Sequence, residues 1–346
     1  MARKKVQKNG DEPQNVGLDI GYGKIKVAHA GVSFTFPSVA GLARNVRFGS
    51  ESNASRFPNE QIEHDGNSWW VGNFASEQLS ASEQRRLRGR SSNADENGMN
   101  FRVLMMKSAL AKLAPETKNG DVLHYRIVTG LPVNHMAQAG ALKKALIGKH
   151  PVHTDSTNFI ANIVDVAVMP EPRGTMFAFT LNPDGSLNDE YSADTTVIFN
   201  GGAVTNDVQY DKNGEFIDTY SGSSRTGHHL ALERLQTMME ERYGETPDLS
   251  VLEAILINKA IKIQGDLVPF GDEVAEALEP VRTGALQLLA DTVNTALTVD
   301  SIIVSGGFAL SSYKSVGDIY PQSVKSANPL FDTAQGYYNY SMFKTW

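Results

Sequence analysis

The regular pattern of the chain begins at Val16, where apolar residues alternate with other residues through VGLDIGYGKIKVAHAGVSFTF. Alternation with a period of two predicts β-strands, because successive side chains of a strand point to opposite faces. The motif Gly21-Tyr22-Gly23 interrupts this alternation once. The segment therefore predicts a strand, a glycine turn and two further strands.

A second segment repeats this plan from Thr195 onward, in TTVIFNGGAVTNDVQYDKNGEFIDTY. It again predicts a strand, a glycine turn, a strand, a turn at Asn213-Gly214 and another strand. A repeated supersecondary pattern indicates two domains built on one plan.

Helical spacing of apolar residues predicts helices over 101–113, 137–148, 227–242, 250–262 and 271–298, the last with a kink at Pro280. Further strands are expected over 124–135, 163–169 and 301–304, and a hairpin is expected at Asp65-Gly66. Residues 41–60 and 76–100 are polar and predict loops, and Pro170-Glu171-Pro172 predicts irregular structure. Strands and helices alternate along the chain, which favours the α/β class.

The composition is that of a globular protein: 41% of the 346 residues are hydrophobic and 21% are charged. The net charge of −7 argues against direct nucleic-acid binding, because an acidic surface repels phosphate backbones. The cluster Arg85-Arg86-Leu87-Arg88-Gly89-Arg90 is the one dense basic segment, and a solvated loop is the favoured interpretation. Zero cysteines exclude disulfides and thiol chemistry, which fits a cytoplasmic protein.

No apolar run is long enough to span a membrane, so we expect no membrane insertion. The first fifteen residues, MARKKVQKNGDEPQN, have a basic start without an apolar segment behind it. They predict a disordered, solvated tail rather than a secretory signal.

The first glycine turn is a candidate phosphate site. Gly21, Tyr22 and Gly23 can bring consecutive backbone amides to one point, and such a nest binds phosphate oxygens. Asp19, just before the turn, is placed to hold Mg²⁺ through its water shell, and Lys24 or Lys26 would add positive charge. A plain hairpin with a solubilising aspartate is the structural alternative. Neither a P-loop nor a G-x-G-x-x-G fingerprint occurs in the sequence.

Two more glycine turns follow predicted strands, at Gly201-Gly202-Ala203 and at Gly306-Gly307. If the first two turns bound the phosphates from opposite sides and the third contacted the base, the three turns would form a nucleotide cleft between the two domains.

Taken together, these motifs resemble the actin-like ATPases of the plasmid-segregation type, the ParM/StbA group and its archaeal actin-like relatives. VGLDIGYGKIKV resembles the first phosphate motif, DGNSWWVGNFA and IVTGLPV resemble segments of domain I, and VAVMPEPRG resembles the strand leading to a catalytic glutamate. SIIVSGGFAL resembles the adenosine motif, and DTAQGYYNYSMF resembles the C-terminal return to domain I. The resemblance covers about residues 16–345.

The resemblance implies an actin-like, ribonuclease H-like fold with domain I over 16–190, domain II over 191–330 and a return to domain I over 331–346. It also implies ATP or GTP with Mg²⁺ as cofactors. Glu171 would polarise the attacking water, and a loop carboxylate without a role is the alternative. The base, ribose and phosphates would be contacted by Arg225, Gly227, Lys259, Gly306, Gly307 and Phe308.

One position departs from the family pattern. The second phosphate motif of the family usually begins with an aspartate directly before its glycines, whereas Phe199 and Asn200 stand there in this chain. Asn200 brings no negative charge to Mg²⁺, so weaker metal binding or slower hydrolysis is expected. Asp207 could substitute as a metal ligand, and a solvent-facing strand residue is the alternative interpretation.

The function that this resemblance implies is a filament-forming ATPase that hydrolyses nucleotide and segregates plasmid DNA through a DNA-binding adaptor. A monomeric small-molecule kinase of the same superfamily is an alternative that would use the same phosphate turns. A structural polymer that binds nucleotide and hardly hydrolyses it is a second alternative, favoured by the missing aspartate.

Overall fold

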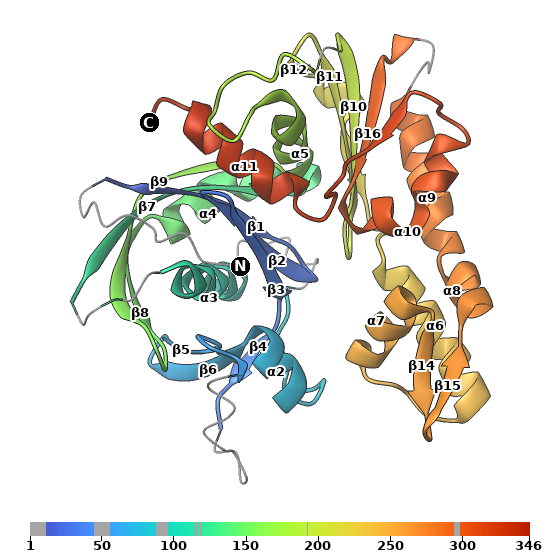
Figure 1. Ribbon diagram of the computed structural model, residues 1–346, viewed down its shortest axis with the longest axis horizontal. Coiled ribbons are helices and arrows are strands. Elements are labelled where there is room, and N and C mark those ends of the chain that lie inside the picture. The colour runs from blue at the N-terminus through green and yellow to red at the C-terminus, as the bar shows by residue number, and fades with distance from the viewer. Residues whose placement is uncertain are drawn as a thin grey trace.

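The computed structural model describes residues 12–44, 56–87, 96–114, 117, 120–191, 193–293 and 298–346. Two sheets dominate the fold, and Figure 1 shows helices on both faces of each. Each sheet extends into a smaller lobe, and both lobes project toward the same side of the molecule.

The first sheet has the strand order β3-β2-β1-β7-β9-β8. Strands β1, β2 and β3 form an antiparallel meander, whereas β7 and β9 run parallel to β1. The bounds of its strands are β1 Gln14–Ile20, β2 Lys24–His29, β3 Val32–Pro37, β7 Val122–Leu131, β8 Gly148–His153 and β9 Asn158–Pro170. One face packs on α3 Glu96–Leu113 and α4 Ala139–Leu146, which follows the short 3-10 helix η1 Val133–Gln138.

The second sheet repeats the arrangement with the order β12-β11-β10-β16-β17. Again the first strand pairs antiparallel with the next one and parallel with a strand from much later in the chain. The bounds are β10 Thr195–Gly201, β11 Asn206–Lys212, β12 Glu215–Phe216, β16 Ser301–Ser305 and β17 Ser323–Lys325, with β13 Gly222–Ser224 and the 3-10 helix η2 Asp218–Tyr220 beside β11. The repeated plan predicted from the two meanders is confirmed.

Helices α5 Glu171–Thr180 and α11 Asp332–Phe343 lie between the two sheets (Figure 1). Helix α11 contacts β1, β2, β7 and α5, while α5 also packs on β10. Three glycines permit this close packing: a Cβ added to Gly17 would lie 2.1 Å from the Ala334 carbonyl oxygen, and one added to Gly336 would lie 1.7 Å from that of Gly174. The C-terminal helix therefore rests directly on the backbone of β1 and α5.

The two smaller lobes differ in construction. The first holds the three-stranded sheet β4 Ala40–Leu42, β5 Gln61–His64 and β6 Asn67–Val71, followed by α2 Gly72–Gln78. The second holds α6 His229–Tyr243, α7 Leu249–Asn258, the hairpin of β14 Ala260–Ile263 and β15 Asp266–Pro269, and α8 Gly271–Ala277. Helices α9 Glu279–Thr292 and α10 Gly306–Gly317 cover the outer face of the second sheet. Within the described residues, no helix combines the length and apolarity that crossing a membrane requires.

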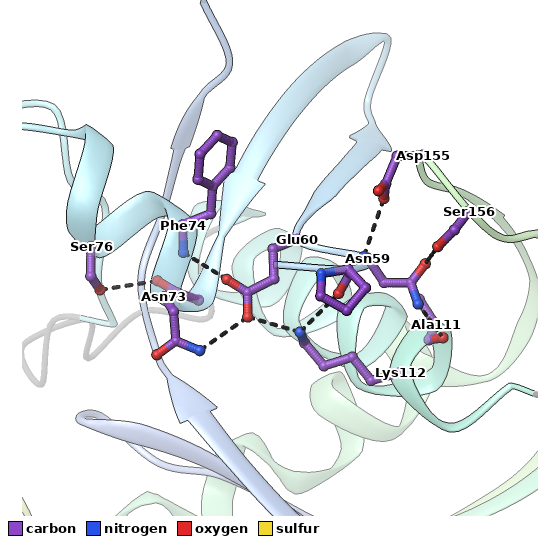
Figure 2. Close-up of polar contacts among 11 residues, drawn as sticks. Asn59, Glu60, Asn73, Phe74, Ser76, Ala111, Lys112, Asp155 and Ser156 are labelled. Atoms are coloured by element: carbon purple, nitrogen blue, oxygen red, sulfur yellow. Dashed lines mark hydrogen bonds and ion pairs between the residues drawn. The ribbon is translucent and has the colours of Figure 1, made fainter. Parts of the chain in front are cut away.

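A buried polar network joins the first lobe to α3, as Figure 2 shows. The carboxylate of Glu60, 2% exposed, accepts hydrogen bonds from the backbone N–H of Phe74 at 2.6 Å and from Lys112 Nζ at 2.8 Å. Asn73 donates a third hydrogen bond to it. Glu60 thus caps the start of α2 and pairs with a cation of α3, which fixes the lobe to the main sheet.

Several expected elements differ in the structure. Helix α5 begins at Glu171, so the prediction of irregular structure there was wrong. Pro172 lies in the first turn, where no amide donor is needed. The hairpin β14–β15 occupies residues placed partly in a helix, and α2, β4 and the start of α3 occupy parts of the predicted loops.

Other boundaries shift by a few residues. Strand β1 begins at Gln14, inside the predicted tail, and residues 1–11 of that tail lie outside the described residues. Residues 88–90 of the basic cluster also lie outside them, while the guanidinium of Arg85 stacks 4.8 Å from the ring of Trp69. One helix with a kink at Pro280 was predicted over 271–298; the structure instead divides this segment at Leu278 into α8 and α9, with Pro280 in the first turn of α9. The division of the chain at residues 190 and 330 stays a prediction.

We expect Glu60→Gln to lower the free energy of unfolding by about 3–5 kcal/mol, because it leaves the Lys112 ammonium without its buried partner. Denaturant unfolding followed by circular dichroism measures the change. Glu77→Gln is the matched control, since Glu77 pairs with Arg56 on the surface and its loss should cost less than about 1 kcal/mol. Equal losses in the two variants would contradict the structural role of Glu60.

Candidate functional site

The glycine turns of the two sheets meet. The first follows β1 at Gly21–Gly23, and the second follows β10 at Gly202–Ala203. A Cβ added to Gly23 would lie 2.8 Å from the Cβ of Ala203, which is closer than such atoms approach in proteins. The two turns therefore face each other in direct contact, and a ligand held by both would lie alongside this contact.

The second turn rests on the start of α6. The backbone N–H of His228 donates to the Gly202 carbonyl at 3.2 Å, and that of His229 donates to the Ala203 carbonyl at 2.8 Å. The His228 ring also contacts the Gly202 carbonyl and Ser311 of α10. The amide of Gly202 itself donates to Thr205, so this amide is engaged within the turn.

Asp19 is the penultimate residue of β1, just before the first turn, and is 4% exposed. Its Oδ2 lies 2.8 Å from the Nζ of Lys26 on β2. Burial alone would lower the pKa of Lys26, but the charge of Asp19 and the hydrogen bond to it raise the pKa above its ordinary value. Of the two candidate lysines, Lys26 is the one inside the site, whereas Lys24 is exposed.

Glu171 is the first residue of α5, at the point where β9 ends. Burial raises the pKa of this carboxyl well above its usual range, and the carboxylates of Asp19 and Asp207 raise it further. Lys26 and Arg102 act in the opposite direction. Glu171 therefore shares one electrostatic environment with both candidate metal ligands.

Asp207 lies on β11 directly opposite Asn200 of β10 and is fully buried, so the interpretation as a solvent-facing strand residue was wrong. Its Oδ1 accepts hydrogen bonds from Ser223 and from the backbone N–H of Val133 at 3.2 Å. Burial raises the pKa of Asp207 to about 6, although these hydrogen bonds lower it. Because Val133 follows β7 of the first sheet, Asp207 also links the two halves of the chain.

Sequence reasoning missed three side chains of this region, those of Arg102, His135 and Tyr337. Arg102 of α3, 7% exposed, donates to the Ile20 carbonyl at 3.4 Å and influences the charge state of Glu171. The hydroxyl of Tyr22 lies 3.3 Å from Nδ1 of His135, which follows the Gly-Leu-Pro break after β7. Burial raises the pKa of Tyr22 to about 12.

The third missed residue is Tyr337 of α11, which is fully buried between Gly130 and Gly174. Its hydroxyl has no hydrogen-bond partner within the described part of the chain. Burial raises its pKa well above the usual range, and the carboxylate of Glu171 contributes to the increase. The residues after β7 and the tyrosines of α11 carry no motif for a phosphate site, so only the fold reveals them.

The remaining candidates lie on the second half of the chain. Gly306 has φ +76° and lies against the Gly201 carbonyl at the start of α10, with Gly307 beside the ring of His228. The Phe308 ring packs on Phe199 in the core, so Phe308 could reach a ligand only through its backbone.

The last three candidates, Arg225, Gly227 and Lys259, differ in their exposure and in their contacts with the other candidates. Arg225 is exposed, and its charge acts on Tyr22 and His135 of the first half. Gly227 is buried, and an added Cβ would lie 2.6 Å from the backbone of Val204 in the second turn. Lys259 is exposed at the end of α7, and no described hydrogen bond or ion pair joins its side chain to the other candidates.

The residues present fit a phosphate group with Mg²⁺. A Cβ at Gly23 would occupy the space between the two glycine turns. In addition, Oδ2 of Asp207 is buried without a hydrogen-bond partner within the described ranges. Mg²⁺ keeps several waters and takes one or two carboxylates, so Asp19 and Asp207 are a sufficient donor set. Among the described residues, we find no group of three or more His, Cys, Asp or Glu side chains that could hold a metal ion by themselves. A metal ion at this site would therefore take further oxygen ligands from water and from the bound phosphate.

Comparison with known proteins agrees with this arrangement. Residues 17–174 match the family model of the actin like proteins N terminal domain. No curated protein sequence matches the chain.

Solved structures match almost the whole chain. Ta0583, an archaeal actin homolog, has a TM-score of 0.77 at 19% identity and covers 95% of this chain and 99% of its own. A ParM from a 15-stranded Clostridium botulinum filament has a TM-score of 0.75 at 20% identity, covering 95% and 99%. The actin-like protein Alp7A has a TM-score of 0.74 at 15% identity and covers 95% of both chains. The resemblance inferred from the motifs, and the actin-like fold that it implies, are confirmed.

We expect Gly23→Ala to separate the two turns, because the new methyl group would overlap the methyl group of Ala203. A displacement of this kind can cost about 10²-fold in activity or binding. Isothermal titration with ATP and GTP, each with Mg²⁺, measures the loss.

The double variant Gly23→Ala/Ala203→Gly is the matched control, since it removes the second methyl group and should restore most of the affinity. Equal affinity in Gly23→Ala and the unmodified chain would contradict a ligand site at this contact.

Proposed function

We propose that this chain, whose residues 17–174 belong to the actin-like N-terminal domain family and whose fold is actin-like, binds ATP or GTP between its sheets and assembles into filaments. The contact of the two glycine turns at Gly23 and Ala203, with the buried carboxylates of Asp19 and Asp207 and the half-buried Glu171 in the same electrostatic environment, is the observation that carries the proposal. The ADP complex of Ta0583 and the ParM filament support it by analogy.

Each charged residue has a role in this proposal. The backbone amides of the first turn hold phosphate oxygens, and Lys26 orients Asp19 through their ion pair. Asp19 and Asp207 hold Mg²⁺, which would neutralise charge on the phosphate oxygens. Glu171, at the start of α5, orients a water molecule and accepts its proton. A high pKa makes Glu171 a stronger base once it is ionised.

We further propose that the filament acts in plasmid DNA segregation in the cytoplasm, through a DNA-binding adaptor. The net charge of −7 supports an adaptor over direct DNA contact.

Light scattering and phosphate release, measured together with Mg-ATP and with Mg-GTP, test the proposal. Scattering that rises with nucleotide and falls as phosphate is released supports a hydrolysing filament. Phosphate transfer only to an added acceptor, without scattering, would instead identify a small-molecule kinase. Electron microscopy of the same samples shows whether the scattering comes from filaments.

A structural polymer with little hydrolysis is the second candidate. Asn200, 6% exposed and opposite Asp207, supplies an amide where the family usually has a carboxylate. Scattering without phosphate release would favour this candidate.

We expect Glu171→Gln to slow hydrolysis by about 10²–10⁴-fold while assembly persists, because glutamine keeps the shape but accepts no proton. Single-turnover phosphate release measures the rate. In the unmodified chain the rate should rise with pH as Glu171 loses its proton, since burial and its neighbours raise its pKa.

Glu190→Gln, at an exposed position, is the matched control and should keep the unmodified rate. An unchanged rate of hydrolysis in Glu171→Gln would contradict the proposal that Glu171 accepts the proton of the attacking water.

We expect Asp19→Ala to abolish both nucleotide binding and assembly, because it removes a metal ligand and leaves Lys26 without its partner. Thermal unfolding with and without Mg-nucleotide measures binding. A ligand at 100 times its Kd stabilises by about 2.7 kcal/mol, and this increment should vanish. Assembly at the unmodified level in Asp19→Ala would contradict the assignment.

A further inference from the structure

A groove of about 700 Å³ lies on the first half of the chain, between the β5–β6 hairpin, α3 and β8. These three elements lie together at the lower left of Figure 1. None of the residues that line the groove belongs to the candidate nucleotide site. Its volume falls within the range of small-molecule sites.

Lys107 of α3 places a buried positive charge at this groove. Its side chain is 6% exposed, and its Nζ donates to the backbone carbonyl of Glu63 at 2.6 Å. No carboxylate in the described part of the chain forms an ion pair with it. Burial lowers the pKa of Lys107 to about 8, although Asp65 and Glu63 raise it, so the amine stays largely protonated at pH 7. A buried ammonium without a direct counter-ion is costly, and a bound anion would remove that cost.

His64 lines the same groove with a ring nitrogen that has no hydrogen-bond partner among the described residues. Its side chain is 9% exposed, and Nε2 makes no hydrogen bond within the described ranges. Oδ2 of Asp65 lies 3.5 Å from this nitrogen, at the outer limit of hydrogen bonding. Burial lowers the pKa of His64, and the charge of Lys107 lowers it further, so the ring is neutral at pH 7.

His150 and His153 of β8 line the same groove. Nε2 of His150 contacts the Leu146 carbonyl at 2.9 Å, and this contact assigns the ring proton to Nε2. Burial lowers the pKa of His150, and the charge of Lys107 lowers it again. The charged and titratable groups around the groove are Glu63, His64 and Asp65 of the β5–β6 hairpin, Lys107 of α3, and His150 and His153 of β8.

We propose that this groove binds a phosphate group, either free or carried by a small molecule, through Lys107, His64 and His150. Lys107 donates a charge-assisted hydrogen bond, and the imidazoles take up protons as the anion enters and donate two more. The unpartnered Nε2 of His64 and the buried ammonium of Lys107, which forms no ion pair within the described residues, are the observations that carry the assignment.

An anion explains these groups better than a metal ion does. Among the residues described, no three side chains of His, Cys, Asp or Glu come together around a metal position. A metal ion would also be repelled by Lys107, whereas an anion is attracted by it. The proposal does not depend on nucleotide binding between the sheets, because the two sites share no residue.

Titration of the folded chain with sulfate, followed by NMR of the imidazole groups, tests the proposal. Sulfate keeps its double charge at all relevant pH values, so the protein alone causes any pH dependence. We expect saturable shifts of the His64 and His150 signals, with affinity that rises as pH falls. Inorganic phosphate and a sugar phosphate, titrated at pH 7 and constant ionic strength, distinguish a free anion from a phosphorylated small molecule by which of them binds more tightly.

Lys107→Met should weaken sulfate binding by about tenfold or more, since it removes a charged hydrogen bond. Lys149→Met is the matched control, because Lys149 is exposed beside His150 and does not line the groove. His150→Gln provides a second variant should Lys107→Met fail to fold, and it should also weaken binding.

Absence of saturable shifts at His64 and His150 would overturn the proposal, and so would equal affinities in Lys107→Met and Lys149→Met. Nucleotide binding should be unchanged in both lysine variants, which separates failure of this proposal from failure of the proposed function.

Discussion

The junction of the two sheets gathers three carboxyl groups, those of the buried Asp19 and Asp207 and the half-buried Glu171, with Lys26 and Arg102 as the nearby cations. Three such groups cannot all be ionised at low cost in a medium that screens charge poorly. The three carboxyl groups are therefore stabilised in different ways. Lys26 pairs with Asp19, while burial and the neighbouring carboxylates raise the pKa of Glu171. The arrangement of strands, helices and turns around this point serves to hold acidic groups together that would otherwise separate.

Much of this centre could be predicted from sequence, because local chemistry determines it. Period-two alternation and glycine turns identified both meanders, and the repeat of the pattern indicated that two like sheets oppose each other. Asp19 and Gly23 were found because a strand followed by a glycine turn exposes amides wherever it occurs. Asn200 and Asp207 lie opposite each other because the turn between them sets the register of β10 and β11.

The remainder depends on tertiary packing, which leaves no local signal. In the sequence, Arg102 is only a polar position on a predicted helix. Its contact with the end of β1 becomes visible only once α3 is packed beneath that strand. Phe308 stands in a motif but packs into the core, where its ring contacts Phe199 and its Cβ lies close to Gly201. The two prolines around Glu171 suggested a loop, whereas proline is also favoured where a helix begins.

The position of α11 has a consequence for how the protein is made. The helix that completes the first sheet and supplies Tyr337 beside Glu171 comes after every other element of the chain. During synthesis the emerging first half therefore exposes the bare backbone of Gly17 and Gly174 until the ribosome has translated the last helix. Because this contact joins residues far apart in the sequence, it can form only after translation of α11.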